Sequence, residues 1–80
     1  MTWQEIREKY PHRWVLVEAF GAYTENGMRV LPKLVVMGEF SDSQSAWKHY
    51  GCIKELAHDR ELYPVHTDTE ALNIKVKTRL

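Results

Sequence analysis

The sequence predicts one small α+β domain over residues 1–80, with the element order α-β-β-α-β-β and a four-stranded, mainly antiparallel sheet. Three observations predict this fold class. Eighty residues are too few for two independently folded units. Apolar residues recur at helical spacing in some segments and alternate with polar residues in others. An Asn-Gly pair between two apolar runs is typical of a hairpin turn.

The first element is expected to be a short helix over residues 3–10. Thr2 and Glu5 have the spacing of a capping box, in which each side chain bonds the backbone N–H of the other. Apolar residues recur at helical spacing until Pro11 stops the turn. This helix should cover the second face of the sheet only in part.

Two strands joined by a hairpin should follow. Residues 13–20 carry β-branched and aromatic side chains on both faces, which indicates a central strand. The pair Asn26-Gly27 separates this strand from the apolar run 28–40. Pro32 cannot donate a ladder hydrogen bond, so we expect the second strand to be an edge, or to bulge at that point.

The main helix is expected over about residues 44–58, on one face of the sheet. Ser41 and Gln44 form a second capping-box pattern, and apolar residues follow at helical spacing. Trp47 of this helix and Trp14 of the first strand are predicted to be core residues, because a small domain has few other large side chains.

Two more strands should close the sheet. Residues 62–67 form a short apolar run, and residues 72–77 alternate strictly between apolar and polar side chains, so the last strand has one wet face. We expect the strand order 2-1-3-4, with the third strand antiparallel beside the first.

Charge and cysteine content restrict the class of protein. Eleven Lys and Arg residues balance eleven Asp and Glu residues, so the chain lacks the attraction that drives nonspecific binding to nucleic acid or anionic membranes. One cysteine cannot form an internal disulfide, and no apolar run has the length of a membrane span. We therefore expect a cytoplasmic protein that binds no membrane.

His49 and Cys52 lie three residues apart on the predicted main helix and share a face, which suits two metal ligands or a thiol–imidazole pair. Zinc needs three or four ligands, and a cysteine nucleophile needs an orienting base and an oxyanion hole that no local motif supplies. We therefore expect no metal and no cofactor, and interpret Cys52 as a small packed thiol beside a surface histidine.

Two further groups are candidates for a site. The segment Val65-His66-Thr67-Asp68 places an imidazole, a hydroxyl and a carboxylate at a strand end, where side chains could converge on a ligand. Alternatively, the segment is a turn in which Asp68 caps backbone groups. Glu18 is the one charge inside the first strand, so its burial would require a cationic partner; otherwise it marks the less covered sheet face.

Four stretches carry a resemblance: WQEI at 3–6, YP at 10–11, WVLVEA at 14–19 and YPVHT at 63–67. In them the chain resembles a family of small, uncharacterised bacterial proteins. The resemblance implies a stand-alone domain of bacterial cytoplasmic origin and supplies no catalytic or binding residues.

The leading hypothesis is a noncatalytic module that forms a homodimer, or docks on another protein, through its edge strand or its partly covered sheet face. A phosphate-binding glycine loop, a nucleophile elbow and an HExxH motif are all absent from the sequence, which favours this role over an enzyme.

Two alternatives remain open. The first is a nucleic-acid-associated regulatory module that uses Lys75, Lys77 and Arg79 on the last strand. The second is a small ligand-binding domain or enzyme around His66, Asp68 and Cys52. The side chains expected to contact a ligand or partner are His66, Asp68, Lys75 and Lys77.

Overall fold

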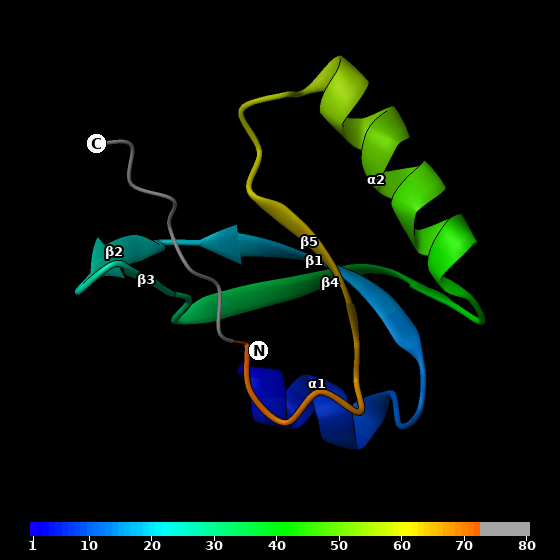
Figure 1. The fold of residues 1–80 in the computed structure, drawn as a ribbon, viewed down its shortest axis with the longest axis horizontal. Helices are drawn as coiled ribbons and strands as arrows, with labels where there is room; N and C mark the ends of the chain where they lie inside the picture. Colours follow the sequence, from blue (N-terminus) through cyan, green and yellow to red (C-terminus); the bar gives the residue numbers. More distant parts are fainter. Residues whose placement is uncertain (73–80) are drawn as a thin grey trace.

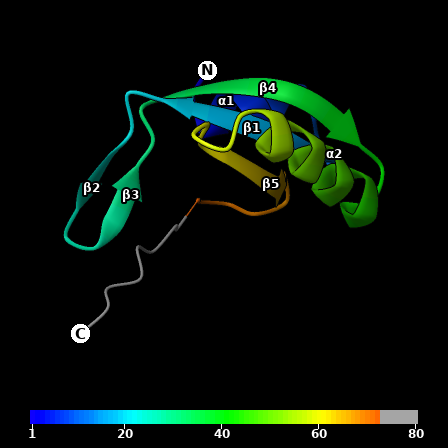
Figure 2. The same cartoon turned by 90° about the horizontal axis from the view of Figure 1, so that it is seen from above.

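The computed structural model describes residues 1–72 as an α+β domain with one helix on each face of a sheet (Figure 1 and Figure 2). An antiparallel three-stranded sheet has the order β4-β1-β5, and β2 pairs with β3 in a separate two-stranded hairpin. The elements in chain order are α1 (Trp3–Lys9), β1 (Trp14–Phe20), β2 (Tyr23–Glu25), β3 (Met28–Val30), β4 (Lys33–Phe40), α2 (Ser43–Leu56) and β5 (Leu62–His66).

Helix α1 begins at the predicted capping box. The Glu5 backbone N–H donates to Thr2 Oγ1 at 3.2 Å, and the Thr2 backbone N–H donates to the Glu5 carboxylate at 2.9 Å. The helix buries Ile6 against the sheet. The short N-terminal helix and its cap are therefore confirmed.

Strand β1 is the central strand of the sheet, as its sequence indicated. Its residues alternate between two covered faces: Val15 and Val17 join Ile6 and Leu34 in the core beneath α1, whereas Leu16 is buried on the α2 side. Five consecutive residues of β1 are buried for this reason.

The hairpin differs from the predicted one. Asn26 and Gly27 form its turn with φ of 51° and 75°, as expected, but the second strand is not continuous from 28 to 40. Pro32 falls between β3 and β4, because it lacks the N–H that a continuing ladder needs. The bulge lies elsewhere, at Met37, where the register with β1 shifts by one residue.

Helix α2 packs on the sheet through a narrow row of side chains. Asp42, rather than Ser41, is its N-cap, and accepts the Ser45 N–H at 2.7 Å. The prediction that Trp47 is a core residue is wrong, since its side chain is 53% exposed. Ala46 is buried at the sheet, and the 100° step to the next residue turns Trp47 onto the flank.

Within residues 1–72, the sheet agrees with the first three positions of the predicted order. β5 lies antiparallel beside β1, opposite β4, which corresponds to the order 2-1-3. The predicted fourth strand, 72–77, lies outside the described residues except for Leu72, which packs against the core. Neither helix in the described part of the chain is long and apolar enough to cross a membrane.

Candidate functional site

His66 and Asp68 lie together at the end of β5, and His12 joins them. His12 Nδ1 is 2.7 Å from Asp68 Oδ1, while the Asp68 backbone N–H donates to His66 Nδ1 at 3.1 Å. His12 was not predicted from the sequence, in which it is only a loop residue after Pro11. Its side chain is 83% exposed, so the pair lacks the desolvated surroundings that tune catalytic acids and bases.

Thr67, the hydroxyl of the same segment, is a structural residue. It is buried, and its Oγ1 accepts the Arg13 backbone N–H at 2.9 Å. Its own N–H donates to the Arg13 carbonyl at 2.9 Å, and its carbonyl accepts Arg7 Nε–H at 2.8 Å. Thr67 therefore fastens the end of β5 to α1 and to the start of β1.

His49 and Cys52 share the flank of α2 that faces β4. The His49 ring lies 5.5 Å from the Phe40 ring, centroid to centroid. The interpretation of Cys52 as a packed thiol is wrong, because the residue is exposed. None of the hydrogen bonds or ion pairs found in residues 1–72 joins Cys52 to His66 or Asp68, and no three His, Cys, Asp or Glu side chains in that range are placed to hold a metal ion.

Glu18 is buried with a cationic partner, as its burial required. Arg60 Nε–H donates to Glu18 Oε2 at 2.8 Å, and Arg60 Nη2 donates to the other carboxylate oxygen. These hydrogen bonds lower the pKa of Glu18, against the opposing effect of burial. Arg60 comes from the loop between α2 and β5 rather than from a strand. The pair supports the fold and keeps Glu18 ionised.

A second ion pair ties the hairpin to the sheet. Arg29 of β3 donates from Nε to one Glu61 oxygen at 3.1 Å and from Nη2 to the other at 2.5 Å. Tyr63 also donates its hydroxyl to Glu61. Burial, followed by the hydrogen bond to the Glu61 carboxylate, raises the pKa of Tyr63 to about 12. Nothing in the local sequence indicates this network, because Arg29 and Glu61 are 32 residues apart.

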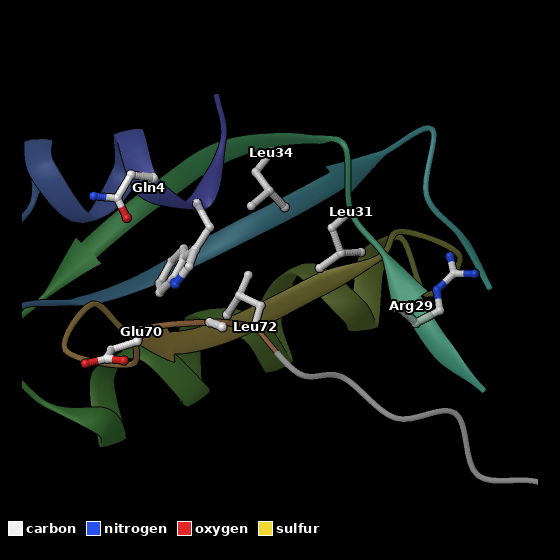
Figure 3. Close-up of a pocket in the computed structure, with 8 residues that line it drawn as sticks. Gln4, Arg29, Leu31, Leu34, Glu70 and Leu72 are labelled. Carbon is white, nitrogen blue, oxygen red and sulfur yellow. The ribbon is translucent and has the colours of Figure 1, made fainter. Parts of the chain in front are cut away.

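A groove of about 320 Å³ lies on the α1 side of the sheet (Figure 3). Leu31, Leu34 and Leu72 point into it, while the Arg29 guanidinium at one end points away toward its own ion pair. Trp3 forms another wall and donates its indole N–H to the Thr69 carbonyl at 2.9 Å. The groove is lined mainly by apolar side chains from segments that are distant in sequence.

The outer edge of β5 is poorly suited to pairing with another strand. The backbones of Glu61 and Thr67 bond to β1, so the alternate residues Leu62, Pro64 and His66 turn their backbone groups outward. Pro64 is the middle residue of this edge and has no N–H. Pro64 therefore protects the β5 edge. Pro32, from which the second strand was expected to be an edge, precedes β4, which is the opposite edge of the sheet.

The outer edge of β4 is also obstructed. The Met1 amine donates to the Leu34 carbonyl at 2.7 Å, and the Leu34 N–H donates to the Met1 carbonyl at 2.9 Å. Further along the strand, the bulge at Met37 breaks the regular spacing of backbone groups. Both edges of the three-stranded sheet thus resist continuous strand addition.

The expectation that the α1 side is the less covered face of the sheet is wrong: the main hydrophobic cluster lies beneath α1, and exposed apolar side chains lie on the α2-side face. Phe20 is 45% exposed and Val35 is 43% exposed. Val35 pairs with Glu18, two residues before Phe20, so the two apolar side chains are diagonal neighbours on one face. Met37 lies on the same face, where its sulfur is 4.0 Å from Arg60 Nη2. We call Phe20, Val35 and Met37 the open patch.

The basic candidates Lys75, Lys77 and Arg79 lie outside residues 1–72, so the structure does not place them. No protein-family model, curated protein or solved structure was found to match the chain.

Proposed function

We propose that this domain is a noncatalytic interaction module that forms a homodimer through the open patch. The observation that carries the proposal is the exposure of nearly half of Phe20 and of Val35, side by side on a sheet face that α2 covers only in part. Adjacent exposed apolar side chains on a rigid sheet are typical of protein–protein contacts. A second subunit would remove them from water.

We expect the second copy to bind a face of the sheet rather than an edge, because the backbone groups of both outer strands are poorly placed for strand pairing. Pro64 removes a donor from the β5 edge, while Met1 and the bulge at Met37 obstruct the β4 edge. Side-chain packing needs none of these backbone groups. The open patch is therefore a better site for a partner than either edge of the sheet.

Leu56 of α2 is a further exposed apolar side chain. It is 90% exposed at the end of α2, seven residues after His49, and so shares the helix flank that meets Phe40 of β4. The chain has no net charge near neutral pH, so two copies would approach without long-range repulsion. These features favour a second copy of the chain as the partner.

Backbone NMR spectra recorded on dilution would test where association occurs. Amide signals of Phe20, Val35 and Met37 should shift between millimolar and low micromolar concentration, whereas those of the exposed hairpin, 23–25, should not. Val35→Glu should abolish the shifts, since it places a charge in the patch. Tyr23→Glu, at a hairpin position that is more exposed than Val35, should preserve them. Shifts confined to other surfaces would contradict the proposed interface.

A further inference from the structure

His12 and His66 bind the same residue, Asp68, in opposite hydrogen-bonding roles. A backbone N–H is always a donor, so His66 Nδ1, 3.1 Å from the Asp68 N, must accept. Neutral His66 therefore carries its proton on Nε2. His12 Nδ1 lies 2.7 Å from a carboxylate oxygen, which can only accept when ionised, so His12 carries its proton on Nδ1.

Protonation has different consequences at the two rings. A second proton on His12 goes to Nε2 and leaves the contact with Asp68 intact. A second proton on His66 goes to Nδ1, where it meets the Asp68 N–H and eliminates that hydrogen bond. Asp68 Oδ2 is 3.7 Å from the same nitrogen, so the imidazolium gains this acceptor when the turn moves by a fraction of an ångström to bring it closer.

When His66 is protonated, we expect the turn that carries Asp68 to move rather than the His66 ring. The His66 ring lies edge-on to Trp14, with centroids 5.4 Å apart, and is mostly buried, whereas the Asp68 side chain is mostly exposed. Thr69 then links the turn to the groove: its N–H donates to the His66 carbonyl, and its carbonyl accepts the Trp3 indole N–H. The next three residues, 70–72, line the groove.

We propose that residues 66–69 form a proton-responsive clasp, in which the charge on His66 sets the position of the turn and of the adjoining groove wall. Histidine is the side chain whose charge normally changes between about pH 5 and pH 8. Charged groups around the clasp include Asp68 in the turn, Glu70 directly after it, His12 before β1, and Arg7 of α1.

Two titratable side chains of helix α2, which also packs on β5, contact residues away from the clasp. Lys54 donates to the carbonyls of His58 and Arg60, in the loop before β5. His49 lies against Phe40 on the β4 side. The carboxylate and imidazole contacts of Asp68 are thus the ones that change when His66 is protonated.

Imidazole ¹⁵N spectra of the full chain between pH 5 and pH 8 test the clasp. At the alkaline end, His66 should be the Nε2–H tautomer and His12 the Nδ1–H tautomer. The Asp68 amide and the Trp3 indole N–H should shift with the same midpoint as His66. An Nδ1–H tautomer at His66, or a Trp3 signal that does not follow its midpoint, would overturn the proposal.

Two variants separate the histidines. His66→Gln should abolish the pH-dependent shift of the Trp3 indole, whereas His12→Gln should retain it. A shift that survives in a folded His66→Gln variant would contradict the clasp. The tautomer measurement on the wild-type chain tests the clasp even where a variant fails to fold.

Discussion

Arg60 donates two hydrogen bonds to Glu18, a buried carboxylate in the central strand of the sheet. Removal of one partner would leave a charge without compensation in a site that water scarcely reaches. We expect Arg60→Met to lower the free energy of unfolding by about 2–3 kcal/mol in urea denaturation, less than for a fully buried pair because Arg60 is itself partly exposed.

The matched control is the double variant Glu18→Leu with Arg60→Met. It replaces both charges by apolar side chains and should recover most of the loss, because no unpaired charge remains. A double variant as unstable as Arg60→Met would show that the cost comes from lost packing rather than from the isolated carboxylate.

Acidification should destabilise the fold through its paired carboxylates. Hydrogen bonds from Arg60 and Arg29 lower the pKa of Glu18 and Glu61, respectively, below the ordinary value of 4.5. The unfolded chain therefore binds more protons than the folded chain at low pH, and the free energy of unfolding falls as the pH decreases from about 4.5. Glu18→Gln should show a shallower decline in urea denaturation across this range; an identical slope would contradict this assignment.

The two tryptophans should differ in their contribution to stability. Trp14 is partly buried and packs on His66, so Trp14→Ala should cost about 2–3 kcal/mol. Trp47 is mostly exposed and keeps an edge contact with Tyr50, so Trp47→Ala should cost about 1 kcal/mol or less. Chemical denaturation measures the free energy of unfolding of each variant. An equal decrease in the two variants would be inconsistent with the exposed position of Trp47.

Cys52 should react with a thiol reagent in the folded protein. Its exposure on α2 predicts stoichiometric labelling by a water-soluble disulfide reagent, at a rate within a few-fold of that in denaturant. Cys52→Ala should change stability little, since the side chain is not packed. Labelling that requires prior unfolding would contradict the exposed position.

Local patterns predicted the elements whose signals are themselves local. The capping box of Thr2 and Glu5 and the hairpin turn at Asn26-Gly27 both depend on residues within four positions. The antiparallel arrangement of β4, β1 and β5 also followed from the order of apolar runs. Trp47 was misplaced because periodicity identifies an apolar side of a helix but not which row contacts the sheet.

Long-range partners could not be predicted from the sequence. Glu18 indicated the need for a cation, yet only the fold shows that Arg60, 42 residues away, supplies it. His12 approaches Asp68 because Thr67 fastens the end of β5 to the start of β1, a contact between distant segments. The protective role of Pro64 likewise depends on the register with β1, which determines which backbone groups point outward.

Sedimentation equilibrium between about 1 and 100 μM tests the central proposal most directly. An interface of about 1,000 Å² or more should form in this range, so the wild-type mass should rise with concentration toward twice the chain mass of 9.4 kDa. Val35→Glu should sediment as a monomer, and Tyr23→Glu as the wild type. A wild-type chain that remains monomeric throughout, or a Val35→Glu variant that dimerises as well as wild type, would contradict a homodimer built on the open patch.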